Sequence, residues 1–96
     1  MRPRYRRSDY VRALRVVISA ELKKHGRTKA DLAFNVLHTK HQQLLSRRLS
    51  GVSAWNIEEL DAVAAYFGMT MLEFWVEVEI ALTWCDLDNV TNPMVG

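Results

Sequence analysis

The second half of the chain contains no Lys and no Arg, because all 13 basic residues lie at or before Arg48. Residues 1–50 carry those 13 positive charges against three acids, a balance of +10, whereas residues 51–96 carry eight acids and no base, a balance of −8. The net charge of +2 conceals this division. One strongly basic half is typical of a protein that presents this half to a polyanion, most often a nucleic acid.

Cysteine and long apolar runs are also scarce. The single Cys85 cannot form an internal disulfide, so nothing indicates an oxidising compartment. No apolar run approaches the roughly 20 residues of a membrane span, and the basic start, Met1–Arg7, lacks the apolar stretch of a secretory signal. The apolar fraction of 49% supports one domain with a core of its own. We therefore expect a cytoplasmic protein that does not contact a membrane.

Helical periodicity and capping signals predict five helices. In the first, apolar residues recur at the three- and four-residue spacing of a helical stripe, with Ser8 as its cap and Gly26 as its end. The other four begin with the capping signals Thr28–Asp31, Thr39–Gln42, Asn56–Glu59 and Thr70–Glu73, and Gly51 and Gly68 end the third and the fourth. Five capped helices joined by short turns leave little room for a sheet, so we predict a compact all-α fold.

The segment from Leu72 to Trp84 is apolar on more faces than one side of a helix can bury. Residues 76–80 also alternate with the period of a strand. The cap at Thr70 and the length of the segment favour a helix of about four turns, and an edge strand that pairs with a second subunit is the alternative. In either case we expect a homodimer to cover the apolar surplus, through Trp75, Val78, Leu82 and Trp84.

Several short motifs, taken in their order along the chain, resemble those of a known family. The pair Leu32-Ala33 is followed by Leu45-Ser46-Arg47-Arg48-Leu49-Ser50-Gly51, and residues 56–68 then combine a polar cap, a Leu-x-x-Val-Ala pattern and a final Gly. This order resembles the helix-turn-helix of the lambda-repressor/Cro-like (XRE-type) family, over most of the chain from Val11 to Trp75. Between Leu32 and Leu45 lie two residues more than is common in the family, and Leu37-His38 replaces the usual Gly of the turn.

The resemblance implies a five-helix, lambda-repressor-like DNA-binding domain over residues 9–69. A flexible basic arm over residues 1–8 precedes it, and a C-terminal helix and tail over residues 70–96, fraying from Asp86, can serve dimerisation. The function implied is a sequence-specific regulator of transcription on double-stranded DNA, a small repressor of the kind that phages and bacteria encode, associated with the nucleoid of a bacterial cell. An antitoxin or another protein-interaction module on the same fold is the alternative.

Helix geometry assigns the residues that would contact DNA. With Leu45 at the centre of the buried face, His41 lies at the border of the core, whereas Gln43 and Arg47 lie on the opposite face. A major groove about 12 Å wide accepts such a helix, in which Lys or Arg suits guanine and Gln suits adenine. We predict base contacts from Lys40, Gln42, Gln43 and Arg47.

Other basic residues suit the phosphate backbone. Thr28 and Lys29 open a helix, where free N–H groups attract a phosphate, and a basic arm can lie along the backbone or enter a minor groove. A solvated, idle arm is the alternative. The predicted phosphate contacts are Arg2, Arg4, Arg6, Arg7, Arg27, Thr28, Lys29 and Ser46.

Catalytic and metal-binding signals are weak. No nucleophile, base and acid stand in a recognisable set, so we expect no enzyme. His38, in the predicted turn, and His41 lie three residues apart and could share a metal with Cys85, but a structural zinc site takes four ligands. We expect no metal and no cofactor, and 96 residues leave no room for a separate domain that senses a small-molecule ligand.

Overall fold

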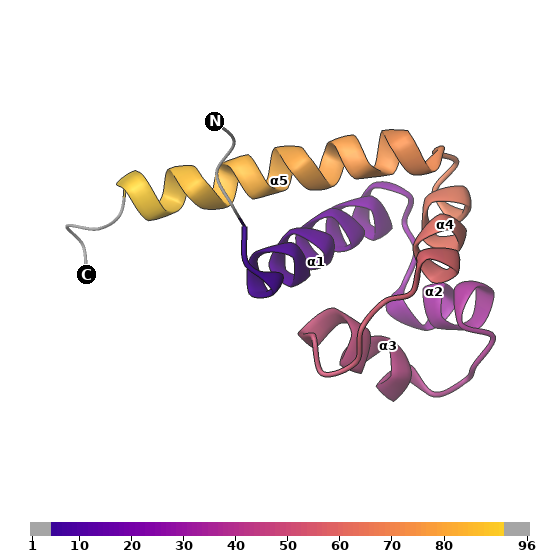
Figure 1. The fold of residues 1–96 in the computed structure, drawn as a ribbon. Coiled ribbons are helices and arrows are strands. Elements are labelled where there is room, and N and C mark those ends of the chain that lie inside the picture. Colours follow the sequence, from indigo (N-terminus) through magenta and orange to yellow (C-terminus); the bar gives the residue numbers. More distant parts are fainter. Residues whose placement is uncertain (1–4, 92–96) are drawn as a thin grey trace.

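The computed structural model describes residues 5–91, with the side chains of residues 5–84. The described chain forms five helices and no strand, which confirms the all-α prediction (Figure 1). The helices are α1 (Arg7–Lys24), α2 (Lys29–Val36), α3 (Gln42–Ser50), α4 (Ile57–Tyr66) and α5 (Met71–Thr91). Residues 76–80, for which a strand was the alternative, lie within α5, and this helix continues through the segment from Asp86 that was expected to fray.

Helix α1 lies at the centre of the molecule. The long helix α5 packs along one side of α1, and α3 packs against α1 from the other side (Figure 1). Helices α2 and α4 contact each other. Because α2 also contacts α3 and α4 also contacts α5, they link the two helices that pack against α1. Helices α3 and α5 therefore lie on opposite sides of α1.

A single apolar cluster fills the space between the helices, and no polar side chain of the described residues is buried. Its largest fully enclosed side chains include Phe74 of α5, Ile18 of α1, Leu32 of α2 and Leu45 of α3. Burying a side chain of this size contributes about 1.5–3 kcal/mol, so this cluster, to which α4 also contributes, is the main connection between the five helices.

Three of the predicted capping boxes are present. At α2, the backbone N–H of Asp31 donates to Oγ1 of Thr28 at 3.2 Å, and the N–H of Thr28 donates back to Oδ2 of Asp31 at 3.0 Å. The same reciprocal pairs join Asn56 with the first turn of α4 and Thr70 with Glu73 at the start of α5. These bonds satisfy N–H groups that have no partner within the helix, so the sequence signals fix where α2, α4 and α5 begin.

Two helix starts differ from the prediction. Helix α1 begins at Arg7 rather than after Ser8, because the N–H of Arg6 donates to Oδ2 of Asp9 at 2.9 Å and so caps the helix earlier. Arg7 and Ser8, which were predicted to belong to the arm, are therefore helical, and Arg2 and Arg4 lie outside the described residues. Helix α3 begins only at Gln42, because the Thr39 hydroxyl accepts the N–H of His41 and caps a turn before the helix.

Candidate nucleic-acid interface

Helix α3 buries one face and exposes the other. Leu45 and Leu49 are in the core, whereas the exposed face carries Gln42, Gln43, Ser46, Arg47 and Ser50. This rotation of the helix agrees with the one predicted, and no acid occurs in α3. Lys40 is exposed but lies two residues before the helix. The structure thus brings the four predicted base-contacting side chains together on α3 and the turn in front of it, and the contact itself stays a prediction.

The turn between α2 and α3 has an unusual backbone. His38 adopts a left-handed backbone conformation, with φ of 53°, which is more usual for a Gly. The N–H of Thr39 donates to the carbonyl oxygen of Ala33 at 3.3 Å, which returns the chain towards α2. His41 is exposed, so the prediction that it borders the core is wrong; it precedes α3 with an extended backbone and does not share the helical spacing of Leu45.

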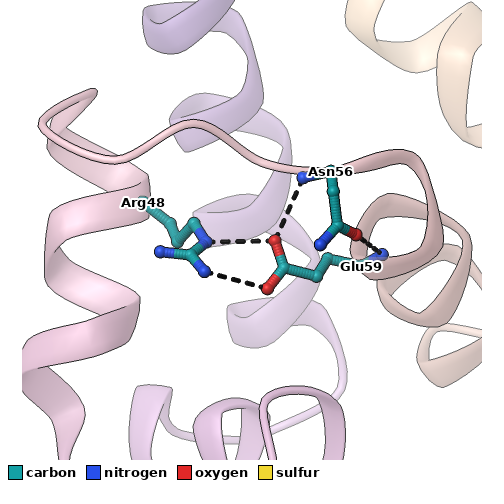
Figure 2. A network of polar contacts seen from close by, with 3 residues as sticks. All are labelled: Arg48, Asn56 and Glu59. Carbon is teal, nitrogen blue, oxygen red and sulfur yellow. Dashed lines mark hydrogen bonds and ion pairs between the residues drawn. The ribbon is translucent and has the colours of Figure 1, made fainter.

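An ion pair that the sequence analysis did not find holds the end of α3. Figure 2 shows Nε and Nη2 of Arg48 donating to the two carboxylate oxygens of Glu59 at 3.0 and 3.1 Å, while Glu59 also accepts the N–H of Asn56. The hydrogen bonds from Arg48 are the main cause of the lowered pKa of Glu59, whereas the partial burial of the Glu59 carboxylate raises this pKa. The pair connects α3 to the start of α4 across the loop between them and so fixes the orientation of α3.

The start of α2 is less free for a phosphate than the sequence suggests. Both the N–H and the hydroxyl of Thr28 donate to the carboxylate of Asp31, and these bonds lower the pKa of Asp31. A negative charge therefore already lies at this helix terminus. Arg27 donates from Nη1 to the carbonyl oxygen of Tyr66 at 2.9 Å and lies over the Tyr66 ring at 4.5 Å from its centroid. Lys29 remains exposed beside them.

Arg7, which was predicted to contact phosphate, has a structural partner. Its Nη2 donates to the carbonyl oxygen of Gly51 at 3.1 Å, where α3 ends in a left-handed residue. A cation at this position suits the negative end of the α3 dipole. The side chains of Arg6 and Ser46, two other predicted phosphate contacts, are exposed.

Two of the four predicted dimer residues are core residues of the single chain. Val78 and Leu82 are 0% and 2% exposed and pack beneath α5, and half-buried Trp75 stacks on Tyr10 with 6.0 Å between the ring centroids. Of the four, Trp84 alone is exposed, at 63%. A second chain cannot reach Val78 and Leu82 unless α5 separates from the core.

A different apolar stripe of α5 faces outward. It consists of Leu72, Val76, Ile80 and Trp84, each four residues from the next, so that it winds by only about 40° per step around the helix. Beside it, exposed Val16 of α1 helps to form a groove of about 350 Å³ between α1 and α5. Both faces of α5 are apolar, so the residues of α5 alone do not indicate which one the core covers.

Other kinds of site have little support within the described chain. No group of three or more His, Cys, Asp or Glu side chains described by the structure could hold a metal ion. None of the described helices combines the length and the apolar character needed to cross a membrane. No known family model, curated protein or solved structure matches this chain. The function is therefore argued from the surface itself.

Proposed function

We propose that this protein binds double-stranded DNA through the exposed face of α3 and regulates transcription as a sequence-specific repressor, with the helix-turn-helix of the lambda-repressor/Cro-like type formed by α2 and α3. The observation that carries the proposal is the composition of the exposed face of α3, where Gln42, Gln43 and Arg47 stand without any acid. The acidic helix α5 lies on the far side of α1, where it would not repel the phosphates (Figure 1).

The side chains on this face suit base recognition in the major groove. Residues near the start of such a helix usually reach the base edges, and this is where Gln42 and Gln43 lie. A Gln amide can bind N6 and N7 of adenine together, and the guanidinium of Arg47 suits O6 and N7 of guanine. Lys29, the first residue of α2, and Lys40 are both exposed. Because α3 begins only at Gln42, Lys40 lies in front of the helix, and both Lys side chains would bind the flanking phosphates.

The rigidity of α3 supports the same function. The Arg48–Glu59 ion pair holds its end, and the capped turn at Thr39 holds its beginning. Because both ends are already ordered, the helix loses little conformational freedom when it binds, and specific contacts are made at a smaller entropic cost.

A homodimer fits the outward apolar stripe of α5. The groove beside the stripe is lined by Val16, Ile80 and Trp84, and Arg12 of α1 and Glu77 of α5 also lie at its walls. A symmetric pair of chains would cover the stripe of each of them. Such a pair could present two α3 helices about 34 Å apart, as a near-palindromic site requires.

Selection from a random duplex library, followed by titration of the selected site, tests the DNA-binding proposal. Gln43→Ala should weaken binding by about 1–3 kcal/mol and relax the preference at one base position. It should leave the melting temperature unchanged, since the side chain is exposed. Thr83→Ala, at an exposed position of α5, is the matched control. Failure of the wild-type protein to bind any duplex at low salt would refute the proposal.

Light scattering at micromolar concentration tests the homodimer. The wild-type protein should have the mass of a dimer, and Trp84→Asp should be monomeric. Val52→Asp is the control, because Val52 is 76% exposed but lies away from the stripe, between α3 and α4. A monomeric wild-type protein, with and without DNA, excludes the homodimer, and the stripe then favours the antitoxin-like alternative, in which it binds a different protein.

A further inference from the structure

A second basic surface lies between α1 and the end of α3. It is a groove of about 500 Å³ whose walls carry Arg7, Ser8, Arg12 and Arg15 from α1, Ser50 from α3 and Gly51, which follows α3. No acidic residue lines it. Neither the base-contact nor the phosphate-contact residues predicted from the sequence include Arg12 or Arg15.

Helix geometry places the basic side chains of this groove on one face. Ser8, Arg12 and Arg15 follow the spacing of four and three residues that brings side chains together along a helix. Arg12 and Arg15 are exposed, and neither forms an ion pair with any residue that the structure describes. Together with the guanidinium group of Arg7, those of Arg12 and Arg15 give the groove a positive potential that favours an anion.

The groove is continuous with the exposed face of α3. Ser50 belongs to that face and also lines the groove, and Arg7 holds the end of α3 against α1 through its bond to Gly51. The nine residues of α3 span about 14 Å along the helix axis. A helix in the major groove lies between the two phosphate backbones, so basic side chains beside the end of α3 approach phosphates other than those near Lys40, in front of its start.

We propose that Arg12 and Arg15 bind phosphodiester groups of the DNA backbone beside the end of α3, a set of phosphates separate from those that Lys29 and Lys40 approach. Guanidinium groups suit this role because their N–H donors match two phosphate oxygens at once. The site rests on the proposed DNA binding and extends it by a second set of phosphates. Arg7 shapes the groove, while Arg12 and Arg15 supply the contacts.

The double variant Arg12→Gln/Arg15→Gln tests this site, with Ala65→Glu/Thr83→Glu as the matched control. Both variants lower the net charge by two at exposed helical positions, but the control changes α4 and α5. For each phosphate contact that is lost, binding to DNA releases about 0.9 fewer counterions. The dissociation constant of the Arg variant should therefore rise on the order of 30-fold near 0.15 M salt, and the slope of log K against log salt should become shallower by about 2.

The expected weakening is equal on the selected site and on random duplex, since phosphates carry no sequence information. Phosphates whose ethylation weakens binding of the wild-type protein but not of the Arg variant should differ from those whose ethylation weakens the wild-type protein but not Lys29→Gln. Equal slopes for the Arg variant and its control would overturn the α1 site while leaving binding by α3 intact. If the wild-type protein binds no duplex at all, the proposed function itself fails, and this result is distinguishable from failure of the α1 site alone.

Discussion

The ion pair between Arg48 and Glu59 should contribute measurably to stability because it is bidentate and largely shielded from water. Its two hydrogen bonds measure 3.0 and 3.1 Å, and the side chains are only 21% and 16% exposed. Exposed pairs contribute roughly 0–1 kcal/mol, and removing one partner of a fully buried pair costs roughly 3–5 kcal/mol. This pair lies between those limits, so we expect each single removal to cost about 2 kcal/mol.

A double-mutant cycle separates the pair from the other roles of its members. Glu59→Gln removes the charge but keeps an acceptor for the N–H of Asn56, because Gln also serves at the third position of a capping box. Arg48→Met keeps most of the aliphatic stem. Unfolding in urea, followed by tryptophan fluorescence, should give a coupling energy of about 1–1.5 kcal/mol between the two substitutions.

The control is Arg47→Met, on the same helix, where the side chain is exposed and forms no ion pair with a described residue. It should change the free energy of unfolding by less than about 0.5 kcal/mol. A coupling energy below about 0.3 kcal/mol between Arg48 and Glu59, so that their effects simply add, would refute the reasoning.

Two more predictions concern the same part of the molecule. Gly51→Ala should destabilise the fold by about 1–3 kcal/mol, because Gly51 has φ of 86° and an added Cβ would lie 3.1 Å from Cγ2 of Val11. The comparison is Gly26→Ala, where φ is 64° but no atom lies within 4 Å of an added Cβ. This substitution should lower the free energy of unfolding in urea by only about 1 kcal/mol. The lowered pKa of Glu59 predicts stability that is present above the unfolded value, about 4.3, and is lost as the pH falls through the folded value. Glu59→Gln should therefore lose less stability than the wild type between about pH 6 and pH 3, and equal losses would contradict this.

Much of the fold was predictable because its signals are local. The boxes Thr28–Asp31 and Asn56–Glu59 each join residues three apart, and the structure forms both. The apolar stripe of α1 is equally local, since Leu14, Ile18 and Leu22 repeat at four residues and all are buried. Such patterns can be recognised without knowing which other helix packs against the segment.

The features that were not predicted depend on residues distant in the sequence. Helix α5 has two apolar faces, and the packing of α1 selects the one with Val78 rather than the one with Val76. Arg48 looks like one more basic residue of α3, and its role follows only from Glu59, eleven residues away across a loop. His41 was assigned to the helix because the spacing to Leu45 fits, but the hydroxyl of Thr39 delays the helix start.

The position of α3 and α5 on opposite sides of α1 makes the molecule an electric dipole. Every Lys and Arg lies at or before Arg48, and the acids Glu73, Glu77 and Glu79 lie on α5 (Figure 1). In the field of a polyanion this dipole experiences a torque that turns the α3 side forward before any contact forms. Approach with α5 leading is repelled at the same time. If α3 binds DNA as proposed, the division of charge raises the rate of encounter, since more collisions occur in orientations from which α3 can bind.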